Sequence, residues 1–229
     1  MCVKKPFSSG SVAASVRLGD GLVLDGRLAL FHEEERWLAV ADLHFGFEAG
    51  RRRDGALWPL WGMESVASRL RELVLHYRPV TLVLAGDVVD GNVEMEAAGE
   101  WLASLHDLGS DLVLIAGNHD RGGVRREFSW VDSWTTGDFF FEHGHLVSSR
   151  PDLPWRVRGH LHPSVRIADG AGTSLRLPAF VMEENEDGSR DLYLPAFSPW
   201  AGGGPHVSNG GKRVRRWVCS PQRVFEVAG

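Results

Sequence analysis

The sequence predicts an α/β protein, a four-layer α-β-β-α sandwich in which two mixed sheets pack face to face and are flanked by helices. Two observations predict this fold. The first half of the chain alternates apolar runs with helical patterns, which is typical of parallel strands joined by crossover helices. The second half has short apolar runs between turns rich in glycine, proline and aspartate, which is typical of a mainly antiparallel sheet.

The first half begins with a predicted hairpin and continues as strand, helix, strand, helix, strand. Residues 21–30 have apolar residues on both sides of an Asp25-Gly26 turn, a common hairpin signal. Residues 63–77 and 93–108 have the apolar spacing of helices, and the first helix stops before Pro79. Three runs without polar alternation are predicted as strands buried on both faces: Trp37–Ala41, Thr81–Ala85 and Asp111–Ala116.

The second half is predicted to contain six strands that complete the fold. They are Phe139–Glu142, Trp155–Arg158, Ser164–Ile167, Ser174–Val181, Asp191–Leu194 and Arg213–Val218. No segment has the composition of a linker. We therefore expect residues 1–229 to form a single domain, in which residues 163–229 complete the second sheet.

The composition restricts the classes of function. Hydrophobic residues make up 43% of the 229 residues, and no apolar run approaches the roughly 18 residues needed to span a bilayer. No apolar signal-peptide segment follows the N-terminal lysines, so the expected location is the cytoplasm. The spacing of Cys2 and Cys219 suggests neither a zinc site nor a redox pair, and we expect two reduced thiols. A formal net charge of −5 disfavours a protein whose whole surface grips long nucleic acid. Two bound divalent cations would nevertheless reverse the field locally.

Polar motifs follow directly on five of the predicted strands. Because groups at the carboxyl ends of strands in α/β sheets converge on one crevice, we expect residues 42–162 to build one site. The motifs are, in order, Asp42-Leu43-His44, Gly86-Asp87, Gly117-Asn118-His119-Asp120, His143-Gly144-His145 and His160-Leu161-His162.

The side chains of these motifs suit divalent cations. Carboxylate, imidazole and amide oxygen without thiolate favour Mn²⁺, Fe or Zn²⁺. One carboxylate between two ligand sets can bridge two ions about 3.5–4 Å apart. Asp87 is the expected bridge because its motif lies between the others in the strand order. An Asp-x-His pair or a Gly-Asp pair alone is common by chance, whereas all five motifs in this order are specific.

The set DxH, GD, GNHD, HGH and GHLH resembles the calcineurin-like metallophosphoesterase superfamily, which includes the SbcD-type nucleases. A finer likeness, to the bacterial DNA-ligase-associated phosphoesterases (the PdeM group), is carried by residues 177–180 and 194–197, both reading Leu-Pro-Ala-Phe, and by Ala201-Gly202-Gly203. The resemblance implies a phosphodiesterase or nuclease acting on nucleic acids or nucleotides. It also implies DNA and DNA-repair proteins as partners, and no membrane.

The resemblance further implies the role of each motif. His119 would be the catalytic imidazole, and Asp120 would orient it. Two divalent ions would be the cofactor, with Mn²⁺ expected and Fe, Zn²⁺ or Ni²⁺ as alternatives. The ligands of the first ion would be Asp42, His44, Asp87 and His162, and those of the second Asp87, Asn118, His143 and His160.

Such a site hydrolyses a phosphate ester by attack of a hydroxide that bridges the two metals. His119 would donate a proton to the leaving oxygen or hydrogen-bond the phosphoryl group. Two alternative functions stay open. One is a small-molecule phosphatase or phosphodiesterase with the same site, and the other is a non-catalytic scaffold of the same fold.

Several further residues have two interpretations each. His145 would either contact the substrate phosphate or be a solvent-exposed turn histidine. Arg121, beside the GNHD motif, is a candidate substrate contact. The three arginines at residues 51–53 reach over the site and bind phosphate, or form a solvated surface. Four tryptophans stack on bases or pack in the core: Trp58, Trp61, Trp155 and Trp200.

Overall fold

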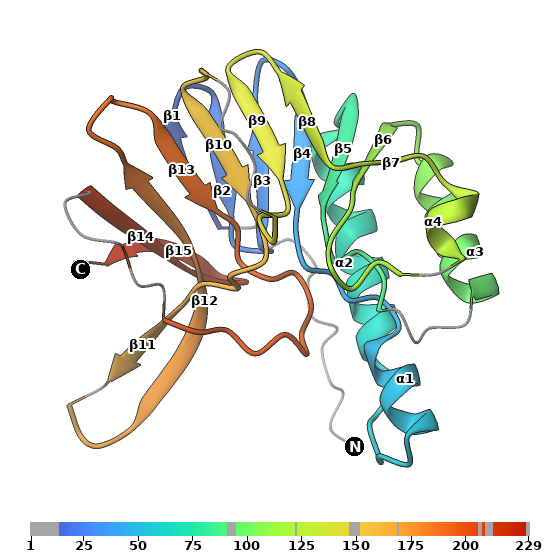
Figure 1. The fold of residues 1–229 in the computed structure, drawn as a ribbon. Helices are drawn as coiled ribbons and strands as arrows, with labels where there is room; N and C mark the ends of the chain where they lie inside the picture. The colour runs from blue at the N-terminus through green and yellow to red at the C-terminus, as the bar shows by residue number, and fades with distance from the viewer. Residues whose placement is uncertain are drawn as a thin grey trace, which may run out of the picture.

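The structure is a computed structural model that describes residues 14–90, 95–121, 123–146, 152–168, 170–205, 208 and 213–227. These residues form two sheets and four helices (Figure 1). The first sheet has the strand order β1-β2-β3-β4-β5-β6-β7. The second has the order β15-β14-β12-β13-β10-β9-β8, and β11 pairs with β12.

The first sheet is mixed. Its strands are β1 (Ser15–Gly19), β2 (Leu22–Asp25), β3 (Ala29–His32), β4 (Trp37–Val40), β5 (Thr81–Ala85), β6 (Asp111–Ile115) and β7 (Trp130–Val131). Strands β1 to β4 pair antiparallel, and β4 to β7 pair parallel. The hairpin predicted around the Asp25-Gly26 turn forms between β2 and β3, with Asp25 opposite Ala29. The predicted strands β4, β5 and β6 occupy the parallel part of the sheet, whose carboxyl ends carry the first three motifs.

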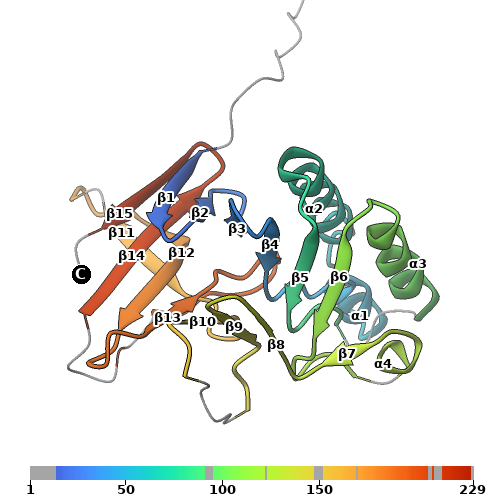
Figure 2. The ribbon, with the colours of Figure 1, turned by 90° about the horizontal axis from the view of Figure 1, so that it is seen from above.

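Four helices lie on the side of the first sheet that faces away from the second (Figure 2). They are α1 (Phe47–Arg53), α2 (Gly62–Tyr77), α3 (Met95–His106) and α4 (Val124–Glu127). Helix α2 buries Val66, Leu70 and Leu73, spaced by three and four positions as the sequence predicted. It ends at Tyr77, and the following cap residue Arg78 has a left-handed φ of 47° directly before Pro79. The predicted start of α3 at Val93 lies outside the described residues.

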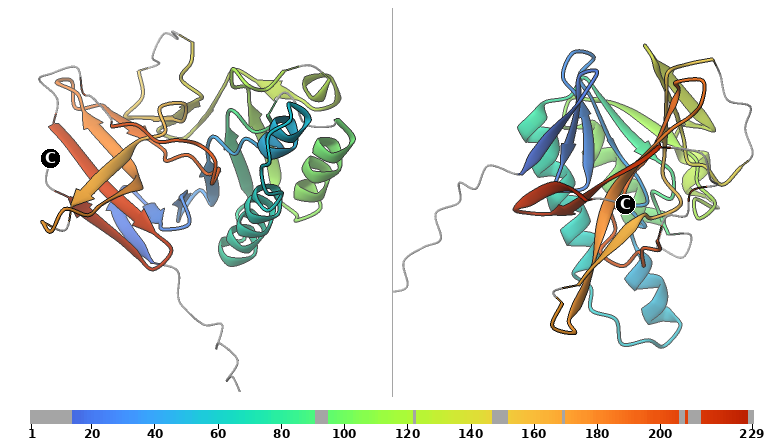
Figure 3. Two further views of the ribbon diagram at one scale, coloured as in Figure 1. Left: turned by 90° about the horizontal axis from the view of Figure 1, so that it is seen from below. Right: turned by 90° about the vertical axis from the view of Figure 1, so that its left-hand side faces the viewer.

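The second sheet is also mixed. Its strands are β8 (Ser133–Thr136), β9 (Phe139–Glu142), β10 (Trp155–Arg158), β11 (Ser164–Ala168), β12 (Ser174–Glu184), β13 (Arg190–Tyr193), β14 (Arg213–Ser220) and β15 (Arg223–Val227). Strand β10 pairs parallel with β9 and β13, and the other pairs are antiparallel. The β11–β12 hairpin projects from one end of the sheet (Figure 3).

The two sheets pack face to face through aromatic side chains. Trp37 of β4 makes edge contacts with Phe139 and Phe141 of β9, with ring centroids 5.0 Å apart in both pairs. The two mixed sheets and the flanking helices predicted from the sequence are confirmed. All described helices lie before position 128, and the described residues after it form none. The described part of the chain therefore builds an α-β-β arrangement, without a helical layer outside the second sheet.

No helix among those described combines the length and the apolar character that a membrane span requires.

Candidate metal centre

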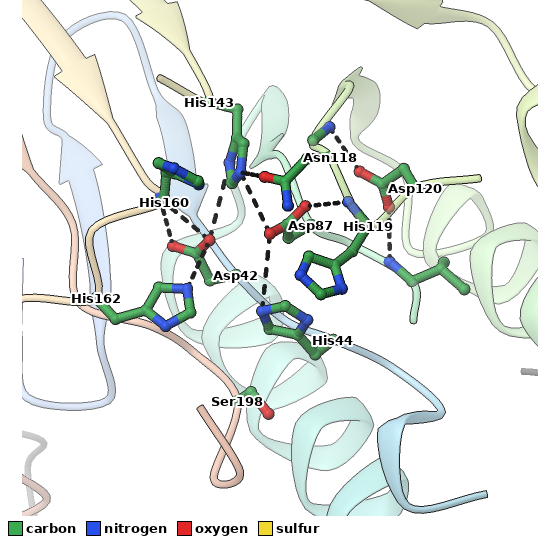
Figure 4. A network of polar contacts seen from close by, with 12 residues as sticks. Asp42, His44, Asp87, Asn118, His119, Asp120, His143, His160, His162 and Ser198 are labelled. Atoms are coloured by element: carbon green, nitrogen blue, oxygen red, sulfur yellow. Dashed lines mark hydrogen bonds and ion pairs between the residues drawn. The ribbon is translucent and has the colours of Figure 1, made fainter. Parts of the chain in front are cut away.

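Strand ends of both sheets bring the polar motifs together. The first three motifs follow the neighbouring parallel strands β4, β5 and β6. The last two follow β9 and β10, which are neighbouring parallel strands of the second sheet. Figure 4 shows the side chains of these motifs pointing toward one another from the two sheets. The site is therefore built between the sheets, at the rim where these strands end.

A first group of potential metal ligands combines one aspartate with two histidines. Asp42, His44 and His162 each place one ligand atom within 4.8 Å of the others. Nε2 of His162 lies 3.1 Å from Oδ1 of Asp42. The backbone N–H of His160 donates to the carboxylate of Asp42, at 3.1 and 3.0 Å from its two oxygens. A residue of the second sheet thus orients a carboxylate of the first.

A second group lies beside the first. Asp87, His143 and His160 also place their ligand atoms within 4.8 Å of one another. Nε2 of His143 is 3.3 Å from Oδ2 of Asp87 and 3.2 Å from Oδ1 of Asn118. The amide oxygen expected from the GNHD motif is therefore next to this second group.

Asp87 lies between the two groups. Its Oδ2 atom is 3.3 Å from Nε2 of His143 and 3.9 Å from Nε2 of His44. Its Oδ1 atom accepts a hydrogen bond of 2.8 Å from the backbone N–H of His119, which orients the carboxylate. A third set of close ligand atoms, from His44, Asp87 and His119, overlaps both groups. This central position is the one that a bridging carboxylate needs.

The backbone of these motifs is strained at the ligand positions. Residues other than glycine rarely adopt a left-handed conformation, which costs on the order of 1 kcal/mol or more at each position. Strain of this kind persists only where the surrounding structure enforces it, and it is common at functional sites. Five of the seven predicted ligands have φ between 45° and 69°: Asp42, His44, Asp87, His160 and His162.

Two glycines allow the ligands to approach so closely. A Cβ atom on Gly86 would lie 2.3 Å from the ring of His143, and Gly86 has a φ of +82°. A Cβ atom on Gly117 would lie 2.2 Å from both the backbone nitrogen and Oδ1 of Asp87. The glycine that opens the GD motif and the one that opens the GNHD motif are therefore sterically required by the ligand arrangement.

The electrostatics of the site follow from two buried carboxylates among imidazoles. Burial alone would raise the pKa of Asp87, but the hydrogen bond and the charge of His143 hold it well below its usual range. Burial lowers the pKa of His143, yet the hydrogen bond that its ring donates to Asp87 and the charges of Asp42 and Asp87 raise it overall. The pKa of His162 is raised in the same way, because Asp42 outweighs burial. Without metal, the carboxylates thus attract positive charge into the site.

His44 behaves differently, and its environment fits a metal ligand. Burial lowers the pKa of His44 in spite of the nearby Asp87 and Asp42. Neither ring nitrogen of this buried histidine has a hydrogen-bond partner among the described residues. A neutral imidazole with a free nitrogen lone pair is the form that binds metal. Together with the thiolate-free donor set, this orphaned ring shows that the residues present fit a pair of divalent cations.

The position of Asp120 corrects one prediction. Oδ1 of Asp120 accepts from the backbone N–H of Val89 at 2.9 Å, and Oδ2 accepts from that of Gly117 at 2.8 Å. The carboxylate is buried, and burial raises its pKa to about 6. No contact joins it to the imidazole of His119 among the described residues. Asp120 therefore holds the backbone of the GNHD turn instead of orienting the histidine ring directly.

His119 is exposed and lies beside the first group of ligands. Its ring centroid is 4.8 Å from that of His44, in an edge contact. It belongs to one of the three sets of close ligand atoms and is the exposed member of that set. A substrate that enters from solvent can therefore meet its imidazole.

The other candidate residues occupy different places. The ring of His145 is 5.2 Å from that of His143, and its buried Nδ1 has no hydrogen-bond partner among the described residues. Arg121 is exposed and donates through Nε to the carbonyl of Asn118 at 3.0 Å. The arginines 51–53 form the exposed last turn of α1. His145 thus lies beside the candidate ligand His143, whereas Arg121 supports the turn that carries Asn118.

The four tryptophans divide into two groups. Trp155 is buried and stacks on Phe139, so the interpretation as core packing applies to it. The ring of Trp200 lies 4.8 Å from that of Trp58 and 4.3 Å from that of Trp61. These three tryptophans form a partly exposed cluster next to α1, which begins three residues after His44.

One neighbour of the site was not predicted from the sequence. The backbone N–H of Ser198 donates to the carbonyl of Asp42 at 3.0 Å, and that of Phe197 donates to the carbonyl of Ala41 at 2.8 Å. The segment that follows β13 therefore runs along the strand end that carries the first motif (Figure 4). Its only signal in the sequence is the preceding Leu-Pro-Ala-Phe, which does not indicate proximity to a metal.

Comparisons with known proteins identify a family and a similar solved structure. A family model described as calcineurin-like phosphoesterase matches residues 36–222. The chain is similar to a solved structure titled as the nuclease MPE of Pseudomonas putida, with a TM-score of 0.67 and 25% sequence identity. That likeness covers 94% of this chain and 100% of the other. No curated protein gave a significant match.

Proposed function

The chain belongs to the calcineurin-like phosphoesterase family, and on this premise we propose that it hydrolyses phosphodiesters of nucleic acids or nucleotides. It is a metal-dependent hydrolase of phosphoric esters with a site for two divalent cations. The observation that carries the proposal is the pair of ligand groups with Asp87 between them. Two ions at such a spacing suit the in-line displacement by which phosphodiesters are cleaved.

The ligand roles are proposed from these contacts. Asp42, His44 and His162 would hold one ion together with Asp87, which both ions would share. Asn118, His143 and His160 would hold the second. When bound, a pair of divalent ions supplies an activated water molecule and neutralises charge on the phosphoryl oxygens.

The chain's own residues supply the remaining chemistry. His119 holds a proton toward the leaving-group oxygen, because its ring is exposed and adjoins the ligand His44. Asp120 is a positioning residue, since its carboxylate accepts from the amides of Gly117 and Val89 and so fixes the turn that carries Asn118 and His119. His145 contacts the phosphoryl group from the side of His143 and His160. Proton donation of this kind contributes about 10²–10⁴-fold to a rate.

Nucleic acid as the substrate is supported by the similar Pseudomonas putida structure, whose title calls that protein a nuclease. We further propose Mn²⁺ as the metal, membership in the DNA-ligase-associated group with DNA-repair proteins as partners, and a cytoplasmic location. These finer assignments rest on the motifs and the residue composition of the sequence.

Hydrolysis of bis-p-nitrophenyl phosphate with and without Mn²⁺ tests the catalytic part of the proposal. We expect metal-dependent turnover, reduced about 10²-fold or more in His119→Ala. His76→Ala, which alters an exposed histidine of α2, is the matched control and should have the parent rate. Absence of turnover with any divalent metal would instead favour a non-catalytic scaffold.

A panel of substrates tests the choice of nucleic acid. Single-stranded and nicked oligonucleotides are compared with small diesters and monoesters under one metal condition. Binding to DNA that weakens steeply as salt rises, with cleavage of the oligonucleotide, is the expected result. Hydrolysis of small esters alone, insensitive to salt, would identify the protein as a small-molecule phosphoesterase.

A further inference from the structure

A cationic cavity adjoins the metal centre. Its volume is about 250 Å³, and its wall includes His162, which also belongs to the first ligand group. Arg69 of α2 and Arg176 of β12 line it as well. Among the described residues that line the cavity, none is acidic. A charged ligand in this space would therefore be an anion that lies next to the metal-binding residues.

Arg69 is a half-buried cation on which the charge of Glu72 acts, but it forms no ion pair among the described residues. Its guanidinium lies 3.9 Å over the ring of Phe197 and donates through one Nη2 hydrogen bond to the carbonyl of the same residue. Its Nε is buried and has no hydrogen-bond partner among the described residues. Burial lowers the pKa of Arg69 to about 10, so the group remains charged at neutral pH. An uncompensated buried donor of this kind favours a ligand that accepts hydrogen bonds.

Arg176 lines the same cavity. It is exposed, and its Nη1 donates to the carbonyl of Gly203 at 2.7 Å, which fixes the guanidinium at the cavity wall. Planar guanidinium groups bind phosphate oxygens through pairs of parallel hydrogen bonds. Two arginines that converge on one space therefore have the geometry of a phosphate site.

A second cavity adjoins the first. Its volume is about 580 Å³, and it shares four lining residues with the first: Leu28, Arg69, Leu177 and Pro178. It is also lined by Glu72 and by Arg27, whose guanidinium forms an ion pair with Asp25. A space of this size accommodates a nucleotide. A ligand that occupies both cavities would extend away from the metal centre.

We propose that Arg69 and Arg176 bind the phosphate adjacent to the one cleaved, so that the preferred substrate is a polynucleotide strand and not an isolated diester or monoester. The proposal rests on the phosphodiesterase function proposed above and specifies its substrate class. His162 joins the two sites, because it borders the cavity and belongs to a ligand group. The strand runs from the metal centre through the smaller cavity toward Arg27.

Short oligothymidylates test this proposal. One has ordinary phosphates throughout, and the other has a single phosphodiester flanked by uncharged methylphosphonates. For the parent protein we expect kcat/KM to be about tenfold or more higher with the first, because hydrogen bonds to charged groups have this magnitude. Arg69→Gln and Arg176→Ala should remove most of this ratio, with little change in the hydrolysis of bis-p-nitrophenyl phosphate.

Arg71→Ala is the matched control, since it removes one exposed positive charge from the same helix as Arg69. Its ratio should equal that of the parent. Fluorescence anisotropy of a labelled oligothymidylate provides a binding measurement independent of turnover, in which Kd should rise about tenfold in the two cavity variants only. If Arg69→Gln fails to fold, the measurements on Arg176→Ala alone test the phosphate subsite.

The outcomes separate the two proposals. The phosphate subsite is overturned if the parent protein has nearly equal kcat/KM values for the two oligothymidylates. It is also overturned if the parent, Arg176→Ala and Arg71→Ala bind the labelled oligothymidylate equally. Either result leaves metal-dependent hydrolysis intact. Absence of all turnover, including that of bis-p-nitrophenyl phosphate, overturns the proposed function. In that event the anisotropy values still decide whether the cavity binds a polynucleotide.

Discussion

At the scale of single residues, the ligand positions depend on backbone conformations as much as on side-chain identity. The left-handed φ values at Asp42, Asp87 and His160 turn each side chain toward the space between the sheets. Glycines on the adjoining turns leave room for those side chains. The sequence motifs identified which residues are candidate metal ligands. The conformations explain why a glycine opens the motifs of Asp87 and Asn118.

Gly117→Ala should disrupt the site strongly. Its Cβ would lie 2.2 Å from Oδ1 of Asp87, so that the central carboxylate must move, and misplacement by about 1 Å can cost on the order of 10²-fold in rate. The measurement is Mn²⁺-dependent hydrolysis of bis-p-nitrophenyl phosphate. Gly202→Ala is the control, because nothing lies within 4 Å of the added Cβ. Equal rates for the two variants would contradict the steric argument.

Cys219 should be chemically inert in the native protein. The thiol is buried, and burial raises its pKa to about 12, whereas the thiolate is the reactive form. In a Cys2→Ser background, which leaves Cys219 as the remaining thiol, a disulfide reagent at pH 8 should react only after guanidinium unfolds the chain. Rapid stoichiometric reaction of the native protein would show that this strand opens to solvent.

At the scale of elements, burial decided which strands could be predicted. Strands β2, β4 and β9 are buried along their whole length and appear in the sequence as apolar runs. The strands that were not predicted, β1, β7, β8 and β15, consist of exposed and half-buried residues. They lie at the ends of the two sheets, where one hydrogen-bonding side has no strand partner and fewer apolar residues are needed. Their sequences therefore resemble loops.

Helix α1 was also not predicted from the sequence, because tertiary contacts stabilise it. The carboxylate of Glu48 is buried and accepts from the backbone N–H of Met63 at 2.6 Å and from Nε1 of Trp200 at 3.0 Å. These contacts join α1 to α2 and to the segment after β13. A helix of seven residues has little intrinsic stability, so such contacts are needed to maintain it.

The end of α2 is attached to the β2–β3 hairpin by a hydrogen bond whose loss can be measured. Tyr77 donates through its hydroxyl to Oδ2 of Asp25 at 2.7 Å. We expect Tyr77→Phe to lower the free energy of unfolding by about 1 kcal/mol, since the ring contact with Phe31 is retained. Urea denaturation checks this, with Leu75→Ala at an exposed position of α2 as the control. A stability equal to that of the parent would show that water replaces this bond.

At the scale of the whole molecule, the metal centre joins the two sheets. The proposed ligands follow three strands of the first sheet and two of the second. Aromatic packing of Trp37 on Phe139 joins the same sheets elsewhere. We propose on this basis that the chain is a single domain whose two halves depend on each other.

Metal binding should therefore stabilise the entire fold. A ligand that binds only the native state at 100 times its Kd adds about 2.7 kcal/mol, which corresponds to a rise in Tm of roughly 5–10 °C for a domain of this size. Thermal unfolding is measured with Mn²⁺ and with a chelator. His143→Ala should reduce the shift, while His76→Ala should not. A shift that is equal in both variants would place the bound metal elsewhere.

The sequence by itself determined the buried strands, the helices α2 and α3 and the candidate ligand set, because each corresponds to a local pattern of contiguous residues. Only the tertiary structure decided which atoms meet. The bond from His160 to Asp42 joins positions 118 apart, and that from Arg69 to Phe197 joins positions 128 apart. The contact of Asp120 with the turn backbone and the cationic cavity beside His162 also depend on how the two sheets pack. Contacts of this kind leave no local pattern, since nothing in the neighbouring residues depends on them.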